Sequence, residues 1–329
     1  MPATFLQAVL ASTLGDFEAA RGRASADAVY TPLLQLDRPG SRRIRLKAES
    51  LQPLGSFKIR CGSNAVGLLN EASASRGLVT VSAGNFAQGL AFAARRRGIP
   101  VIAHVPEGAP AVKVNKLRKL GVTVVPQSPA EWWRIASTRD TCGRGGTFIH
   151  PVCDPAVVHG NGVIALELAE QWPEIDTVVV PFGGGGLVTG IAMAFRELGK
   201  RVRIIACEVE GTAALQAARL ADAPVTIEQQ RSFVDGIGSS RVLDEMWPVL
   251  RALVSDVVVV SVQEVKTALR TIVSEHHLVV EGAAAAALAA ATSDRCGGAN
   301  VAAILTGGNI DPAVLCAILS EPASESEHS

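Results

Sequence analysis

Apolar runs rich in β-branched residues alternate along this chain with segments of helical periodicity. The runs predict strands near residues 43–48, 78–82, 100–105, 121–126, 177–182, 202–207, 256–261 and 301–306. Helical patterns fill the intervals between them. Strands that alternate with helices in this way are typical of a doubly wound α/β architecture built on parallel sheets. At 329 residues the chain is also long enough for its core to divide into two lobes.

Four consecutive glycines, Gly183, Gly184, Gly185 and Gly186, stand between a buried apolar run and a helical pattern that begins at Leu187. Residues without Cβ let backbone N–H groups converge on an anion, and the following helix adds the positive end of its dipole. A close-packed turn and half of a dinucleotide site are the alternatives for the glycines alone. Neither G-x-G-x-x-G nor G-x-x-x-x-G-K-[ST] fits GGGGLVTG, so a phosphate site is favoured.

Lys58 lies in the segment SLQPLGSFKIR, in a chain where only seven of the 31 basic residues are Lys. The common role of lysine is a solvated surface charge. Here Ser56 is a candidate N-cap, and Lys58 falls in the first turn of a predicted helix between Phe57 and Ile59. The helix dipole and the apolar neighbours both favour the neutral amine, which is the form that attacks an aldehyde.

Polar residues also follow two other predicted strands. The segment VTVSAGNFAQG places Ser82, Gly84 and Asn85 at the start of a helix, where hydroxyl, amide and N–H groups can bind a carboxylate. The segment VAAILTGGNID places the Thr306 hydroxyl at the carboxyl end of a strand, the edge at which ligands bind in open parallel sheets. Each turn taken alone is also common in α/β proteins.

In this order and spacing, the motifs GSFK, SAGN, GGGG and TGGN resemble those of fold-type II pyridoxal-phosphate enzymes, specifically the serine/threonine dehydratase and serine racemase family. The resemblance covers about residues 30–312. It implies a fold like that of the tryptophan synthase β chain and pyridoxal 5'-phosphate as the cofactor. A large cofactor-binding domain would consist of residues 1–75 and 153–329, with a small domain, residues 76–152, inserted in it.

The resemblance implies that the cofactor-binding residues come from several of these segments. They are Phe57, Lys58, Asn85, Gly183, Gly184, Gly185, Gly186, Leu187, Gly236, Glu281 and Thr306. Lys58 would form the imine with the cofactor, Asn85 would bind the ring 3-oxygen, and Thr306 would face the pyridine nitrogen. The glycines and the Leu187 N–H would hold the phosphate, and Gly236 would supply a carbonyl near the cofactor.

The resemblance also implies a segment that binds the substrate carboxylate, formed by Ser82, Ala83, Gly84, Asn85 and Phe86. The chain departs from the family here, because relatives usually have His at the position of Phe86. Racemase relatives have Ser at the position of Ala83, where it serves as the second acid/base. A methyl group cannot carry a proton, so Ala83 favours elimination over racemisation.

The sequence does not decide whether a divalent cation binds. The family's cation site begins with an acidic residue that matches Glu208, but Ala214 stands where the racemase offers a second acid.

The function predicted from these residues is a β-elimination. A neutral Thr306 hydroxyl does not keep the pyridine nitrogen protonated as a carboxylate would, which favours prompt loss of a β-leaving group over transamination. We therefore expect an L-threonine/L-serine ammonia-lyase that yields a 2-oxo acid and ammonia. The alternatives are a 3-hydroxyaspartate dehydratase, a serine racemase, a β-replacement enzyme, and a non-catalytic protein that binds pyridoxal phosphate or an amino acid.

Composition excludes several partners. The formal net charge is zero and the basic residues are scattered, so no nucleic acid is expected. The most apolar long segment, residues 282–291, is about half as long as a membrane span and predicts a buried helix. Six cysteines without a C-x-x-C pair indicate reduced thiols, and no targeting signal is seen at the N-terminus. We expect a cytoplasmic homo-oligomer, a dimer, with a small amino acid as its substrate and no membrane partner.

Overall fold

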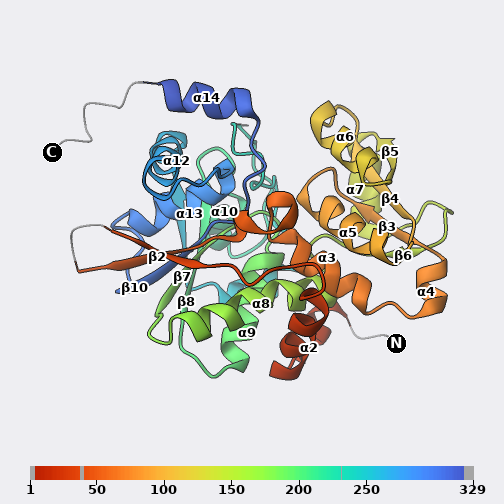
Figure 1. Cartoon of the computed structure of the whole chain (residues 1–329), viewed down its shortest axis with the longest axis horizontal. Helices are drawn as coiled ribbons and strands as arrows, with labels where there is room; N and C mark the ends of the chain where they lie inside the picture. Colours follow the sequence, from red (N-terminus) through yellow and green to blue (C-terminus); the bar gives the residue numbers. More distant parts are fainter. Residues whose placement is uncertain (1–3, 38–40, 231, 322–329) are drawn as a thin grey trace. The chain divides into compact units, whose positions relative to one another are not determined.

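The computed structural model describes residues 4–37, 41–230 and 232–321 (Figure 1). The chain divides into two compact units. Unit 1 is formed by Met1–Tyr30, Gln52–Glu170 and Thr189–Lys200, and unit 2 by Thr31–Leu51, Gln171–Val188 and Arg201–Ser329.

Unit 1 contains a sheet of four parallel strands in the order β5-β4-β3-β6. Its strands are β3 (Leu78–Val81), β4 (Val101–Pro106), β5 (Thr123–Gln127) and β6 (Thr147–Phe148). Its helices are α1 (Phe5–Leu10), α2 (Leu14–Ala24), α3 (Lys58–Gly67), α4 (Glu71–Ser75), α5 (Asn85–Arg96), α6 (Ala111–Lys119) and α7 (Pro129–Thr138), with most of α8 (Pro155–Gln171) and α9 (Gly186–Glu197).

Both faces of this sheet are covered. Along a strand, residues of opposite parity point to opposite faces. Leu78 of β3 packs into a large apolar cluster with residues of α3 and α5, whereas Val81 packs with Ile135 of α7. The carboxyl end of β3 and the residues that follow it therefore lie between two layers of helices.

Unit 2 contains a sheet of six strands in the order β1-β2-β10-β7-β8-β9. Its strands are β1 (Leu33–Leu36), β2 (Arg43–Lys47), β7 (Thr177–Pro181), β8 (Arg203–Val209), β9 (Asp256–Val260) and β10 (Asn300–Ile304). All neighbours are parallel except β1, which runs antiparallel to β2 at the edge. Its helices are α10 (Ala214–Ala221), α11 (Trp247–Leu253), α12 (Val262–His276), α13 (Gly282–Thr292) and α14 (Pro312–Ser320).

The buried helix predicted over residues 282–291 is confirmed as α13, in which every residue from Gly282 to Ala291 is buried. It packs against the sheet of unit 2 on one side and against α12 on another. Small side chains allow this close approach because they add little thickness between the layers. Among the described residues, none of the helices has both the length and the apolar character that crossing a bilayer requires.

The eight predicted strands are all confirmed, with ends that differ by a few residues at most, and so is the α/β class with parallel sheets. Two short strands, β1 and β6, were not predicted. The division into residues 1–75 with 153–329 and residues 76–152 stays a prediction. All four strands of the smaller sheet lie within 76–152, while unit 1 also takes in residues outside that range.

Candidate active site

Lys58 is the first residue of α3 in unit 1. A tight turn leads into the helix, with Leu54 at φ 65° and Gly55 at φ 63°. The prediction that Ser56 is the N-cap of this helix is wrong by one residue. The N-cap is Phe57, which makes no side-chain cap hydrogen bond. The Ser56 hydroxyl accepts a long hydrogen bond from the Lys58 N–H at 3.4 Å. The turn therefore sets the position of Lys58 through backbone geometry more than through capping.

Two aromatic rings flank the amine of Lys58. Its Nζ lies 4.9 Å from the ring centroid of Phe57 and 5.6 Å from that of Phe86. Both rings are buried, and Phe86 also packs into the apolar cluster of unit 1. The apolar surroundings expected for Lys58 are confirmed, and Phe86, from the predicted substrate segment, forms part of them.

The backbones of α3 and α5 are in direct contact at two glycines. A Cβ atom added to Gly89 of α5 would lie 2.6 Å from the Lys58 carbonyl oxygen, and one added to Gly62 of α3 would lie 2.6 Å from the Gly89 carbonyl carbon. Real Cβ atoms do not approach other atoms so closely. This contact fixes Lys58 relative to the N-terminal part of α5.

The predicted substrate segment forms the turn between β3 and α5. Ser82, Ala83, Gly84 and Asn85 are partly exposed, and the Ser82 hydroxyl accepts the Gly84 N–H at 3.2 Å. Gly84 is the N-cap of α5 and contributes no side-chain cap, so the first N–H groups of the helix are not covered by a capping side chain. A helix start of this kind suits a carboxylate.

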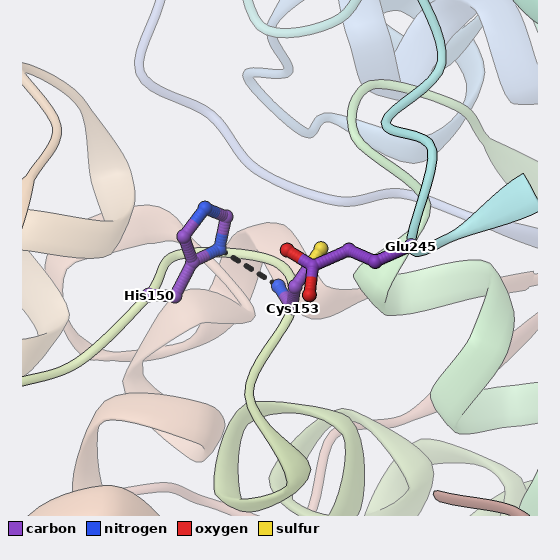
Figure 2. Close-up of side chains that lie close together, drawn as sticks. All are labelled: His150, Cys153 and Glu245. Atoms are coloured by element: carbon purple, nitrogen blue, oxygen red, sulfur yellow. Dashed lines mark hydrogen bonds between the residues drawn. The ribbon is translucent and has the colours of Figure 1, made fainter. Parts of the chain in front are cut away.

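His150 was not among the predicted site residues. Figure 2 shows its ring beside the loop that follows β6, with Nδ1 accepting the Cys153 N–H at 2.8 Å; it also accepts the Val152 N–H at 3.1 Å. Burial, and the positive charges of Arg139 and Lys58, lower the pKa of His150 to about 3. The imidazole is therefore neutral at ordinary pH. Glu245, also labelled in Figure 2, belongs to unit 2.

In unit 2 the four glycines follow β7, and α9 begins at Gly186. Gly185 has φ +96°, a conformation that L side chains rarely adopt. The turn also approaches the segment VDGIG. A Cβ added to Gly183 would lie 3.8 Å from the Gly236 carbonyl oxygen, and the Ser239 hydroxyl donates to the Gly183 carbonyl at 3.4 Å. Two predicted cofactor-binding segments therefore lie next to each other.

Two more predicted residues join the same group in unit 2. A Cβ added to Gly236 would lie 3.3 Å from Oε1 of Glu281, and the Glu281 N–H donates to the Gly307 carbonyl at 2.9 Å. The neighbouring Thr306 is only 3% exposed. Its Oγ1 has no hydrogen-bond partner within the part of the chain that the structure describes. Unsatisfied buried hydroxyls are costly and uncommon, so this one marks a position where a bound group would find a partner.

Glu208, the candidate cation ligand, lies on β8 and is 1% exposed. Its two carboxylate oxygens accept the N–H groups of Leu215 and Gln216, each at 2.8 Å. Burial raises the pKa of Glu208 to about 7, against the opposing effect of these hydrogen bonds. The Ala214 side chain, at the position of the second acid, is fully buried.

Residues 25–307 match the model of a protein family described as pyridoxal-phosphate dependent enzymes. The chain therefore belongs to this family, whose members use pyridoxal 5'-phosphate. The groups in each unit fit this cofactor. Unit 1 offers a lysine amine in apolar surroundings, and unit 2 offers the glycine turn before α9 together with the unpartnered Thr306 hydroxyl.

The comparisons point to the threonine ammonia-lyase and serine racemase group. An L-threonine ammonia-lyase of Thermotoga maritima is 35% identical over 280 residues, which cover 84% of this chain and 70% of that protein. A serine racemase of Oryza sativa subsp. indica is 32% identical over 322 residues, 93% of each. The structure of maize serine racemase matches with a TM-score of 0.85 and 32% identity, over 93% of this chain and 96% of that one. The structure of the processed form of threonine deaminase isoform 2 from Solanum lycopersicum matches with a TM-score of 0.82 and 27% identity, over 93% of this chain and 86% of that one.

Proposed function

We propose that this chain is an L-threonine/L-serine ammonia-lyase, which converts a small L-β-hydroxy amino acid into a 2-oxo acid and ammonia. The observation that carries the proposal is the buried, unpartnered hydroxyl of Thr306 at the carboxyl end of β10. Thr306 would offer the pyridine nitrogen of the cofactor a neutral hydroxyl, which does not keep that nitrogen protonated as a carboxylate would, and this favours loss of a β-substituent over transamination. Similarity to threonine ammonia-lyases supports the same reaction.

Three segments of the chain have proposed roles in binding. Pyridoxal phosphate, joined to Lys58 when bound, supplies the electron withdrawal that makes the α-proton of an amino acid acidic. The N–H groups of the glycine turn and of Leu187, at the start of α9, hold its phosphate. The turn from Ser82 to Asn85 binds the substrate carboxylate with the N–H groups at the start of α5.

Lys58 is the proposed base. Its amine takes the α-proton, the Cα–Cβ double bond forms, and the β-hydroxyl receives that proton from Lys58 and leaves as water. Water then hydrolyses the resulting enamine to the 2-oxo acid and ammonia. The rings of Phe57 and Phe86 lie beside this amine and hold its position.

Residue 83 is the feature that opposes the racemase alternative, to which the serine racemase relatives point. Racemisation requires a second group that delivers a proton to the face of the substrate opposite Lys58. Ala83 stands at the position where racemase relatives have Ser, and its side chain carries no proton to deliver. We therefore expect keto acid and ammonia from L-serine without appreciable D-serine.

Phe86 supports the choice of substrate. Its ring faces the Lys58 amine and offers neither a charge nor a hydrogen bond to a substrate side chain. A 3-hydroxyaspartate would bring a second carboxylate that needs a cationic partner. Threonine and serine are therefore the proposed substrates, with kcat/KM higher than for the 3-hydroxyaspartates.

The test is a substrate panel on the purified holoenzyme, with 2-oxo acid and ammonia measured from L-threonine, L-serine and the 3-hydroxyaspartates. Higher kcat/KM for threonine or serine supports the proposal. Preference for a hydroxyaspartate, rapid D-serine formation on chiral chromatography, or turnover only with O-acetylserine and sulfide would each replace it by the corresponding alternative. Binding of cofactor and amino acid without turnover would identify a non-catalytic protein. The homodimer and the cytoplasmic location stay predictions.

A further inference from the structure

The carboxylate of Glu208 faces the first turn of α10. Oε1 accepts from the N–H of Leu215 and Oε2 from that of Gln216, both at 2.8 Å, and the N–H of Ala214 interacts with the same carboxylate. The helix has no side-chain cap of its own, because its N-cap residue is Ala213. Glu208 therefore satisfies, from the neighbouring strand β8, N–H groups that would otherwise have no partner in the helix.

This geometry is unfavourable for a cation at the same carboxylate. Both oxygens already accept N–H donors, and the positive end of the α10 dipole lies against them. A cation there would meet N–H groups and a partial positive charge in place of further oxygen ligands. Calcium and magnesium ions require several oxygen ligands.

The acids that would complete a cation site are also missing or engaged elsewhere. Position 214 is a buried alanine. The nearest acid in sequence, Glu210, accepts the N–H of Val262 at the start of α12 with Oε1 at 2.9 Å. Within the described ranges, Glu208 belongs to no group of three or more His, Cys, Asp or Glu side chains with ligand atoms close enough to share an ion.

We infer that Glu208, at the position where the family's divalent-cation site begins, serves this chain as the N-terminal cap of α10 and binds no divalent cation. The helix takes the place of the ion in neutralising the carboxylate. The stability of the fold around β8 and α10, and any turnover by the enzyme, are then independent of magnesium and calcium. The inference rests on membership of the family, and its main readout, thermal stability, does not depend on the proposed reaction.

The experiment compares the melting temperature of the holoenzyme in EDTA with that in saturating Mg²⁺ or Ca²⁺. If a specific site were present, a cation concentration of about 100 times its Kd would raise Tm by several degrees. We expect a change below about 1 °C. Activity in the same samples should change by less than about twofold. A cation-induced rise of several degrees in the wild type that disappears in Glu208→Gln would overturn the inference.

The Glu208→Gln variant separates a cap from a ligand. The side-chain amide donates hydrogen bonds and cannot replace both accepting oxygens, so we expect Tm to fall by several degrees and to the same extent in EDTA and in Mg²⁺. Glu210→Gln, which removes a charge on the same segment and keeps an accepting oxygen for Val262, is the matched control and should change Tm less. A cation-induced rise that persists in Glu208→Gln would show that an ion binds elsewhere and would overturn the predicted independence of stability from cations. If Glu208→Gln fails to fold, the wild-type comparison in EDTA and in cation still decides.

Discussion

Gly89→Ala tests whether the contact between α3 and α5 holds Lys58 in its working position. The added Cβ would lie 2.6 Å from the Lys58 carbonyl oxygen and 2.8 Å from its carbonyl carbon, whereas ordinary contacts begin at 3.4 Å. Since both atoms belong to backbone, one helix must move by about 0.8 Å. Overpacking of this kind costs about 1–3 kcal/mol, and a displacement near 1 Å at a reacting group costs up to roughly 100-fold in rate.

We therefore expect Gly89→Ala to lower Tm by several degrees and to lower kcat/KM for L-threonine by about 10- to 100-fold. Thermal unfolding and a 2-oxo acid assay on the same preparation measure both effects. Gly22→Ala is the control, because a Cβ at Gly22 in the exposed face of α2 meets nothing within 4 Å. That substitution should leave kcat/KM unchanged and raise stability by about 0.5–1 kcal/mol. If Gly89→Ala has the same kcat/KM and Tm as the wild type, the reasoning is refuted.

Four further predictions address single side chains. Lys58→Ala should lose the yellow colour of the bound cofactor and lower the elimination rate more than about 100-fold with the circular dichroism unchanged; retained colour and turnover would contradict the role of Lys58. Ala83→Ser should add measurable D-serine formation to the elimination. If chiral chromatography detects no D-serine, residue 83 is not what prevents racemisation in this chain. Thr306→Val should raise the stability of the cofactor-stripped protein by about 1–2 kcal/mol, because a buried hydroxyl without a partner is replaced by a methyl, and should weaken binding of pyridoxal phosphate; a less stable apoprotein would argue against it. His150 has a pKa of about 3 in the fold and 6.5 as its ordinary value, so the unfolded chain binds the extra proton between these values and stability should fall as pH drops from about 6.5 towards 3. His150→Gln should make that fall less steep in urea titrations, and an unchanged slope would mean that other groups control acid unfolding.

Local signals explain why the strands and the glycine turn were predictable. Buried parallel strands are continuous apolar runs, and the four glycines interrupt the pattern where β7 ends and α9 begins. The edge strand β1 was missed because it is only four residues long and is stabilised by pairing with β2, which no pattern inside LLQL indicates. The strand β6, with two residues, gives even less signal.

The site could be predicted in part. Single motifs indicated Lys58 and Thr306, but the approach of Glu281 to Gly236 depends on loops that are far apart in sequence. His150 was missed because a histidine two residues after a short strand is common, and only the fold shows its ring bound by the backbone of its own loop. Likewise, the sequence did not decide whether a cation binds Glu208, because packing determines which groups a carboxylate faces.

The helix α13 limits how this chain can vary. All ten residues from Gly282 to Ala291 are buried, nine of them Ala or Gly, so the helix has no solvent-facing side on which substitutions would be tolerated. Each larger side chain would have to displace the sheet or α12. Glu281, beside the proposed cofactor group, is the N-cap of this same helix, so a displaced α13 would also move Glu281. Directed evolution that randomises residues 282–291 should therefore return few functional variants, and the segment should serve as a fixed reference around which loops and substrate pocket diversify.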